Sequence, residues 1–409
     1  MKKTIEPASS ICALLLIATS FAAPKTDAEE PTRTDTGFPV TPVFAAGQDG
    51  YNVFRIPAVV RAANDDLLAF CEARQGGDAS EIDLVMKRST DGGNSWGSLQ
   101  VVQKNSDFRQ YVSDAVTEIT IGNPAPVVDL IDPEHGGRIW MPFTLENDRV
   151  FVIHSDDHGA TWSSRHEITP DVKKKAWGWY ATGPVHSIQI QRGPHRGRLV
   201  VPADHRIGPD GHDGGDLGAH LILSDDHGKT WRLGALDETY DDAIGANETT
   251  VVELADGTLY INTRNQLGGK PGTRGEAWSG DGGETLESHD PRWKAFRPAS
   301  ELLDPPVVQG ALLAVKDNLI VFSAPDQNGP SGSGRSDLRL RYSADQSKTW
   351  LDGPLIYTGP AAYSDLVMVG DQTVGVLFEN GDASGKNAYQ RISFARVDVG
   401  KIQHAGGDQ

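Results

Sequence analysis

Short stretches of alternating apolar and polar residues recur along most of this chain, separated by segments rich in glycine and aspartate. Such stretches are typical of β-strands that pack one face on a core. In six successive places one strand of this kind is followed by a second that begins at small or charged residues, as in FRIPAVV (54–60) and DDLLAFCEAR (65–74). The later copies begin at residues 123, 185, 248, 307 and 363. The pattern therefore predicts repeated copies of one antiparallel unit.

An eight-residue box, Ser-x-Asp-x-Gly-x-Thr/Ser-Trp, follows a third strand in most units. Full copies occupy residues 89–96, 155–162 and 224–231, and degenerate copies occupy residues 279–286 and 343–350. The starts are 66, 69, 55 and 64 residues apart, and this period predicts one supersecondary unit copied around or along an axis. Aspartate accepts hydrogen bonds from nearby backbone N–H groups, and glycine adopts a positive φ without steric cost. We therefore expect each box to hold a hairpin rather than to carry chemistry.

The repeated unit predicts the fold class. With a fourth, outer strand expected after each tryptophan, six antiparallel four-stranded sheets predict an all-β, six-bladed β-propeller. A linear solenoid is the alternative, but this unit is longer and richer in strands than the common solenoid repeats. We place the propeller at residues 43–403 and a tail at residues 404–409.

The beginning of the chain has a different composition. Residues 1–23 start with lysines and continue as an apolar stretch that ends in small residues, which predicts a secretory signal peptide. Residues 24–42 are polar and rich in proline and threonine, as expected for a leader or linker. No other apolar run reaches the length of a membrane-spanning helix, so we expect an exported protein, periplasmic or extracellular. Cys71 is the only cysteine after residue 23, which excludes an intrachain disulfide in the cleaved chain.

Charge narrows the range of partners. The formal net charge is −18, which argues against a nucleic-acid partner because such proteins present a basic face. An anionic ligand would have to be bound by a local cluster of arginines. No histidine pair has the spacing of a metal site, so we expect no metal and no cofactor.

Candidate functional residues stand where inner strands begin or where neighbouring strands end. In a propeller these places converge on the axis, where ligands bind. Individually each candidate is most often a surface residue, but chance explains the whole set poorly. The candidates are Arg55, Arg74, Glu248, Arg264, Arg335, Tyr363 and Glu379, together with Asp78 at the centre of a glycine-rich loop (residues 75–81).

An ordered set of motifs over residues 51–397 resembles one known family. The chain is similar to the bacterial exo-α-sialidases (neuraminidases) of the six-bladed propeller type. Boxes of this kind alone occur in many unrelated secreted propellers, whereas the ordered combination is specific. The matching motifs are FRIP (54–57), the serial boxes, EAR (72–74), WYATGP (179–184), NETTVVELADG (247–257), RSDL (335–338) and GPAAYSDL (359–366).

The resemblance implies how a sialic acid would be bound. Arg55, Arg264 and Arg335 match the arginine triad that holds the substrate carboxylate, and Arg74 matches a further arginine near C4 of the sugar. Guanidinium groups bind a carboxylate with paired, permanently charged donors, which lysines would not reproduce. Glu379 matches the carboxylate that orients Arg55.

The resemblance also implies the catalytic groups. Tyr363 matches the nucleophile, Glu248 its partner and Asp78 the general acid/base. A neutral phenol avoids the repulsion that a carboxylate nucleophile would meet from the substrate carboxylate, and sialidases are a known exception to the two-carboxylate rule. A phenol needs a base to take its proton, and an acid must hold a proton to donate. We therefore expect the pocket to raise the pKa of Asp78, and covalent attack followed by hydrolysis to retain the anomeric configuration.

Two alternatives remain at this point. A trans-sialidase, an anhydro-forming sialidase or an enzyme for deaminated sialic acid would share the same arginines and tyrosine. A non-catalytic glycan-binding propeller would share only the boxes and the scaffold. Because no lectin module is visible to hold an acceptor, hydrolysis of sialylated glycoproteins, glycolipids or oligosaccharides is the favoured prediction.

Overall fold

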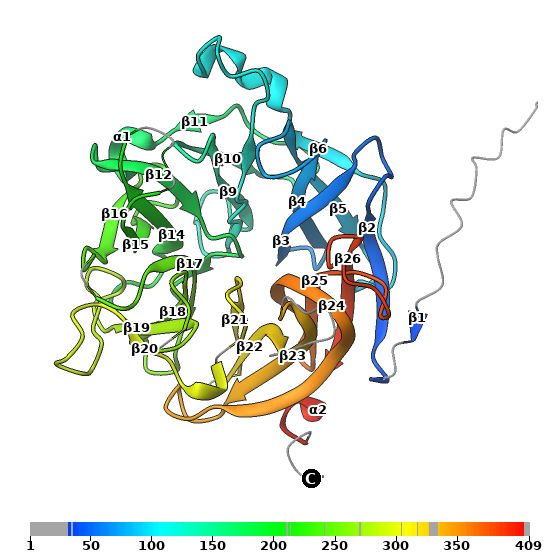
Figure 1. Cartoon of the computed structure of the whole chain (residues 1–409), viewed down its shortest axis with the longest axis vertical. Helices are drawn as coiled ribbons and strands as arrows, with labels where there is room; N and C mark the ends of the chain where they lie inside the picture. Colours follow the sequence, from blue (N-terminus) through cyan, green and yellow to red (C-terminus); the bar gives the residue numbers. More distant parts are fainter. Residues whose placement is uncertain are drawn as a thin grey trace, which may run out of the picture.

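The computed structural model describes residues 32–33 and 36–404, apart from residues 210–211, 213, 241, 270, 304, 317 and 327–333. The predicted signal peptide (1–23) and residues 405–409 of the predicted tail lie outside the described residues. The named strands all pair antiparallel, and Figure 1 shows their sheets arranged around a central axis. The prediction of an all-β propeller is therefore confirmed.

Four sheets each use one continuous stretch of chain. The first contains β3 (Val53–Arg61), β4 (Leu67–Arg74), β5 (Ile82–Ser89) and β6 (Gln100–Gln103). The second contains β7 (Ile121–Gly122), β8 (Val127–Asp129), β9 (Arg138–Leu145), β10 (Arg149–Ser155) and β11 (His166–Glu167). The third contains β12 (Trp177–Thr182), β13 (Ile188–Gln189), β14 (Leu199–Ile207), β15 (Leu217–Ser224) and β16 (Arg232–Leu236). The fourth contains β17 (Ala246–Glu253), β18 (Leu259–Asn265), β19 (Arg274–Ser279) and β20 (Arg297–Pro298).

The remaining strands form one eight-stranded sheet in the order β1-β2-β26-β25-β24-β23-β22-β21. The long strand β24 (Leu351–Gly370) joins its two halves, because it pairs with β23 up to Pro360 and with β25 from Ala361 onward. The other strands of this sheet are β1 (Thr32–Arg33), β2 (Pro39–Ala45), β21 (Ala311–Lys316), β22 (Leu319–Asp326), β23 (Ser336–Ser343), β25 (Thr373–Asn380) and β26 (Arg391–Asp398).

Helical segments are few and short. They are the 3-10 helices η1 (Asn105–Tyr111) and η2 (Glu301–Leu303) and the α-helices α1 (Thr169–Val172) and α2 (Val399–His404). Within the described part of the chain, no helix combines the length and the apolar character needed to cross a membrane.

The expectation of four strands in each sheet is wrong for the second and third sheets. Their innermost strand is divided, so that β7 and β8 both pair with β9, and β12 and β13 both pair with β14. Prolines fall in each gap, at Pro124, Pro126 and Pro184. Proline cannot donate a ladder hydrogen bond, which explains why strand pairing stops there.

Strand β2 joins the last sheet from the N-terminal side. It pairs with β26 from Val40 to Ala45 and with the short strand β1 through Pro39 and Val40, so sheet pairing begins N-terminal to residue 43, where we placed the start of the propeller. The pairing of β2 with β26 thereby closes the ring (Figure 1).

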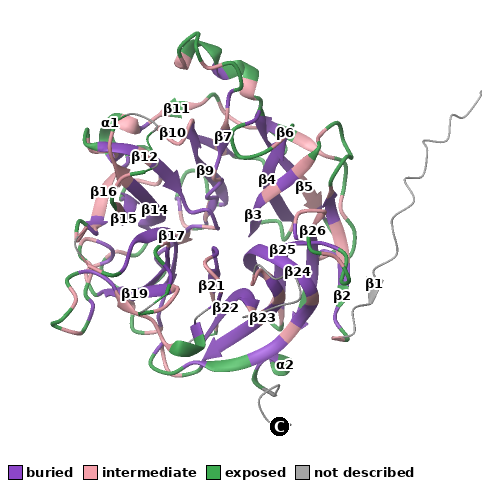
Figure 2. Cartoon of the chain, in the orientation of Figure 1, coloured by how far each residue is buried: buried purple, intermediate pink, exposed green. Residues whose placement is uncertain are grey.

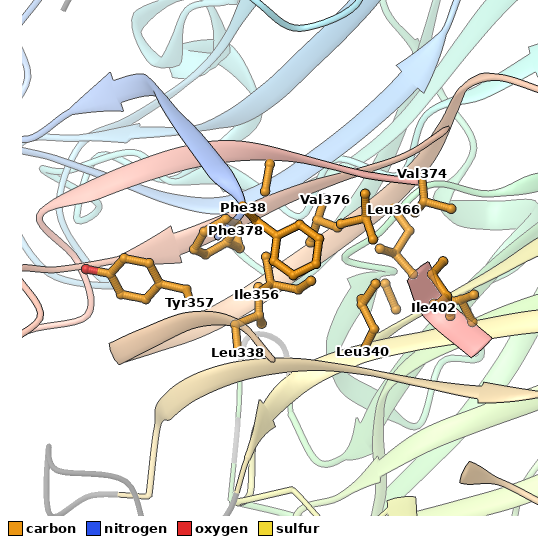
Figure 3. Packing of buried hydrophobic residues seen from close by; sticks show 14 of the residues in the cluster. Phe38, Leu338, Leu340, Ile356, Tyr357, Leu366, Val374, Val376, Phe378 and Ile402 are labelled. Carbon is orange, nitrogen blue, oxygen red and sulfur yellow. The ribbon is translucent and has the colours of Figure 1, made fainter. Parts of the chain in front are cut away.

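The apolar core lies between neighbouring sheets, and the second strand of each unit is almost entirely buried (Figure 2). These strands are β4, β9, β14, β18, β22 and β25. In the cluster drawn in Figure 3, Leu338 of β23, Ile356 of β24 and Phe378 of β25 pack together. Phe38, just before β2, and Ile402 of α2 belong to the same cluster. Each such buried side chain contributes roughly 1.5–3 kcal/mol, so both ends of the described chain stabilise the ring.

The boxes lie between the third and outer strands, as expected. In the second box, Ser155 Oγ donates to Asp157 Oδ1 at 2.8 Å and accepts from Gly159 N at 2.7 Å. Thr161 donates its N–H to Asp157 Oδ1 at 2.8 Å and its hydroxyl to Asp157 Oδ2 at 2.6 Å. The degenerate fifth box keeps the same bonds, with Ser347 at a φ of 65° in the place of glycine.

Replacing a box aspartate is expected to weaken its hairpin. Asp157→Ala should lower the free energy of unfolding by about 1 kcal/mol, the usual net value of such hydrogen bonds. Hydrogen bonds from Thr161 lower the pKa of Asp157 to about 2, below the ~3.9 of an unfolded aspartate. The stability difference should therefore be complete above pH ~4 and disappear as the pH falls toward 2. Thermal unfolding across this range measures it, and Asp114→Ala, at an exposed aspartate, should show no such pH-dependent loss.

Candidate active site

Seven of the eight predicted site residues line one pocket of about 640 Å³. The pocket collects the starts of inner strands, the ends of the strands beside them and the loop after β4. It also contacts residues that we did not single out, among them Glu72, Asn123, Trp179, Asn247 and Tyr389. The predicted residues that line it are Arg55, Arg74, Asp78, Glu248, Arg264, Arg335 and Tyr363.

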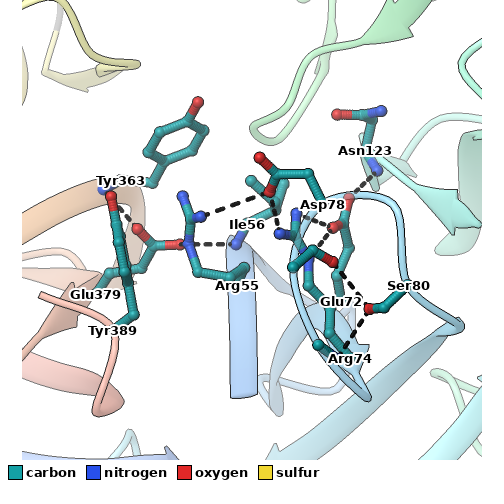
Figure 4. A network of polar contacts seen from close by, with 12 residues as sticks. Arg55, Ile56, Glu72, Arg74, Asp78, Ser80, Asn123, Tyr363, Glu379 and Tyr389 are labelled. Carbon is teal, nitrogen blue, oxygen red and sulfur yellow. Dashed lines mark hydrogen bonds and ion pairs between the residues drawn. The ribbon is translucent and has the colours of Figure 1, made fainter. Parts of the chain in front are cut away.

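A bulge in β3 aims Arg55 into the pocket. The register of β3 against β4 shifts between Arg55 and Ala58, and Ile56 has a φ of 61°, which is rare for a β-branched residue. Glu379 of β25 holds this geometry, because it accepts from Arg55 Nε at 2.6 Å and from Ile56 N at 2.9 Å. Glu379 is fully buried and also accepts from Tyr363 N at 3.1 Å. The predicted contact between Glu379 and Arg55 is present (Figure 4).

Tyr363, Glu248 and Arg264 form a buried triad beside Arg55. The Tyr363 hydroxyl donates to Glu248 Oε1, and Arg264 Nη1 donates to Glu248 Oε2 at 2.8 Å and to Tyr363 Oη at 3.2 Å. Tyr363 is 7% exposed and Glu248 9%. Burial and the charge of Glu248 raise the pKa of Tyr363, against the opposing charges of Arg264 and Arg55. The phenol is therefore protonated at neutral pH and hydrogen-bonded to a base.

Tyr389 contacts both Arg55 and Arg335, two members of the predicted arginine triad. Its ring lies 4.0 Å from the Arg55 guanidinium, and its hydroxyl accepts from Arg335 Nη1 at 3.0 Å. Arg335 Nη2 donates to the Val307 carbonyl at 2.9 Å. We did not predict Tyr389, which lies in the loop between β25 and β26. The guanidiniums of Arg55 and Arg335 lie 5.2 and 5.9 Å from the Tyr363 ring centre, and Arg264 Nη1 lies 3.2 Å from its hydroxyl oxygen. The structure therefore brings the three predicted arginines together around one phenol.

Asp78 reaches over the pocket from its loop, with its side chain 87% exposed. Arg74 Nη1 donates to Asp78 Oδ1, and Arg55 Nη1 lies 3.9 Å from the same oxygen. Burial alone would raise the pKa of Asp78, but the charge and hydrogen bond of Arg74 and the charge of Arg55 outweigh it and lower the pKa. The expected rise is therefore wrong for the protein alone, where Asp78 is a carboxylate.

Glu72 holds the guanidinium of Arg74 by hydrogen bonds. Arg74 Nε donates to Glu72 Oε2 at 2.8 Å, and Asn123 N donates to Glu72 Oε1 at 2.8 Å (Figure 4). Glu72 was not among the predicted residues, although it stands two positions before Arg74 in the EAR motif and therefore on the same face of β4. The motif contained the signal for this pair.

Aromatic and polar residues complete the lining of the pocket. Arg206 lies with its guanidinium 4.9 Å from the Trp179 ring centre, and both residues line the pocket together with Asn147 and Gln266. No group of three potential metal ligands lies in the pocket among the described residues. Away from it, His227 Nδ1 contacts Asp129 Oδ2 at 2.8 Å, near Asp132.

The arrangement suits recognition of a carboxylate beside a reacting carbon. Three guanidiniums lie around Tyr363, and the carboxylate of Glu248 contacts its hydroxyl. The exposed Asp78 carboxyl, on the loop after β4, lines the same pocket. An anion bound by the guanidiniums would lie next to a phenol that can lose its proton to Glu248.

Comparisons with known proteins agree with this geometry. Residues 65–376 match the family model of the BNR repeat-like domain. The chain is 30% identical to a sialidase from Micromonospora viridifaciens over 90% of this chain, which spans 57% of that relative. It is 30% identical to an exo-alpha-sialidase from Aspergillus fumigatus, over 86% of each protein.

A solved structure is also similar. The Hadza microbial sialidase Hz136 superposes with a TM-score of 0.72 at 25% identity, over 89% of this chain and 69% of that one. The repeat family, the two sequence relatives and the architecture around the axis all indicate the same protein family. The chain belongs to the exo-α-sialidase family of BNR-repeat glycoside hydrolases.

Proposed function

We propose that this protein hydrolyses terminal sialic acids from glycoconjugates, with retention of anomeric configuration, through a tyrosyl-enzyme intermediate. One observation carries the proposal: the buried Tyr363 hydroxyl donates to Glu248, which Arg264 holds at 2.8 Å. A glycan-binding propeller without catalysis has no need of a base against a buried phenol.

Binding would use the arginines first. The carboxylate of a sialic acid would take the donors of Arg55, Arg264 and Arg335, which converge beside Tyr363. This places the anomeric carbon, which carries that carboxylate, next to the phenol oxygen. Glu379 holds Arg55 by a hydrogen bond and Tyr389 by its ring. The Arg55 side chain is therefore already ordered and loses little rotamer freedom when the substrate binds.

The first displacement would form the covalent intermediate. As Tyr363 Oη bonds to the anomeric carbon, its proton passes to Glu248, and the bond to the leaving glycan oxygen breaks. Asp78 would supply the proton that this oxygen needs. The substrate carboxylate neutralises guanidinium charge, and the bound sugar excludes water. Both changes raise the pKa of Asp78 relative to the protein alone.

The second displacement would release the product. Asp78, now a carboxylate, takes a proton from water as the water oxygen bonds to the anomeric carbon. The bond to Tyr363 breaks, and Glu248 returns the proton to the phenol. Two displacements at one carbon retain its configuration.

We also propose six blades and an exported protein. Support for six comes from β24, whose two halves pair with different strands, so the eight-stranded sheet can be counted as two blades. Export is supported by the composition of residues 1–23.

Product stereochemistry tests the proposed reaction. The protein should cleave a fluorogenic α-sialoside and sialyl-lactose, and NMR of the first turnovers should show the α-anomer of free sialic acid before mutarotation. Lactose added in excess should leave the product unchanged. Initial formation of the β-anomer would refute the covalent route, and absence of any cleavage would refute the sialidase proposal itself.

A further inference from the structure

Arg274, the first residue of β19, is a buried arginine behind the pocket. It is 1% exposed, and among the described residues no carboxylate forms an ion pair with it. Its Nε donates to Asn262 Oδ1 at 2.7 Å and its Nη1 to the Val308 carbonyl at 2.9 Å, both neutral acceptors. Its Nη2 has no hydrogen-bond partner. A buried charge without a counter-ion is costly, so this position needs an explanation.

The neighbour of Arg274 across the sheet is another arginine. Arg274 pairs directly with Arg264 in the register of β18 and β19, and residues directly opposite share a face and repel when their charges are alike. Arg264 in turn binds Glu248 at 2.8 Å. One carboxylate therefore stands against two guanidiniums, and Glu248 is the group whose charge acts most strongly on Arg274.

The other acid on this face is already occupied. Glu276, two residues after Arg274 on β19, accepts from Tyr260 Oη at 2.9 Å and pairs with Arg297 at 2.9 Å. The ring of Phe322 covers the Arg274 guanidinium at 5.3 Å. Burial lowers the pKa of Arg274 to about 9, which still leaves the guanidinium charged at neutral pH.

We propose that Arg274 is a positioning residue whose charge, set directly opposite Arg264 in the sheet, stabilises the Glu248 carboxylate as the acceptor of the Tyr363 proton. This inference rests on the proposed function and adds a residue that does not touch the substrate. It explains why the buried Arg274 has no carboxylate partner: its positive charge stabilises the negative charge of Glu248.

The other groups around Glu248 fit this role. Arg264 of β18 and Tyr363 of β24 bind its two oxygens. Asp204 of β14 is fully buried, and its Oδ2 accepts from Asn247 Nδ2 at 2.6 Å. Burial and the charge of Glu248 raise the pKa of Asp204, which favours its neutral form. Asp204 therefore does not compete with Glu248 for the charge of the guanidiniums.

Two variants remove the surplus charge in different ways. Arg274→Met deletes it, while Asn262→Asp keeps the arginine and places a carboxylate of nearly equal size at its Nε. In both, the acidic limb of the kcat/KM profile should move up by ~1 pH unit, which lowers kcat/KM by up to about 10-fold at pH values below the limb. Arg274→Lys, which keeps a charge, should retain the wild-type acidic limb.

Arg341→Met is the matched control, since Arg341 is buried but paired with Asp326 at 2.8 Å. This substitution should lower the stability of the protein and leave the acidic limb unchanged.

The inference is overturned if folded Arg274→Met has the same acidic limb as wild type. If Arg274→Met does not fold, an unchanged acidic limb in Asn262→Asp overturns it instead. A wild type without sialidase activity would instead refute the proposed function. In that case NMR of glutamate labelled with ¹³C at its carboxyl carbon, with Glu248→Gln for assignment, decides the role of Arg274. The Glu248 signal should titrate at higher pH in Asn262→Asp than in wild type, and equal midpoints would contradict the role.

Discussion

Replacing Tyr363 by phenylalanine is expected to lower kcat/KM for α-sialosides on the order of 10³-fold or more, as loss of a covalent nucleophile does in other hydrolases. The substitution removes only the hydroxyl. Glu248 keeps Arg264 as a partner at 2.8 Å, so no buried charge is stranded and the protein should unfold near the wild-type temperature. Steady-state kinetics and thermal unfolding measured on the same preparation separate the two effects.

Tyr389→Phe is the matched control for this prediction. It removes a hydroxyl at the same pocket, the one that accepts from Arg335 at 3.0 Å, but leaves the ring stacked on Arg55 at 4.0 Å. We expect its effect to fall mainly on KM and to stay within about tenfold, the value of one hydrogen bond to a charged group. Activity of Tyr363→Phe within tenfold of wild type would refute the nucleophile assignment. A covalent sugar adduct seen by mass spectrometry in wild type and missing in Tyr363→Phe would support it.

Much of the scaffold follows from local sequence. Alternating apolar and polar residues predict the strands because successive side chains of a strand point to opposite faces, and the boxes predict hairpins because their own aspartates satisfy the turn. The gathering of Arg55 and Glu379 is less local. The two residues are 324 apart in the sequence. The repeat placed both at strand ends near the axis, and the resemblance to the sialidases supplied the prediction that Glu379 orients Arg55.

Other features had no local signal. The segment PVTPVFA that forms β2 contains two prolines and resembles a linker, and only ring closure gives it a partner in β26. Tyr389 lies in a polar loop, and its contact with Arg55 depends on the path of that loop in space. The divided inner strands depend on where prolines fall in the ring, which the apolar pattern alone does not show.

The protonation of Asp78 shows a further limit of sequence reasoning. Its role in proton donation suggested a raised pKa, whereas Arg74 and Arg55 lower it in the protein alone. The protonation state of Asp78 that donation requires differs from its state in the free protein, because the substrate carboxylate changes the charge of the pocket. The sequence of the protein alone gives no information on that charge.

Replacing Asp78 by asparagine is therefore expected to have an effect that depends on the leaving group. For sialyl-lactose, whose leaving oxygen needs a proton, kcat should fall by ~10²–10⁴-fold, the usual contribution of a general acid. For an aryl sialoside whose phenolate leaves without help, the fall in the first displacement should be much smaller. Glu81→Gln, an equal charge change in the same loop at an exposed residue, should leave both substrates unaffected. Equal losses in the first displacement of both substrates would contradict the acid role.

The pH profiles give the same prediction a second readout. The profile of kcat/KM reports the free enzyme, and that of kcat reports the complex. Asp78 must be protonated to donate, and its pKa is lowered in the free protein. The basic limb of kcat/KM should therefore lie at lower pH than the basic limb of kcat, where the bound carboxylate has neutralised Arg55 and the sugar excludes water. In Asp78→Asn this limb should disappear from both profiles. Coincident limbs in wild type would mean that substrate binding does not change the protonation of Asp78, and the proton would have to come from another group.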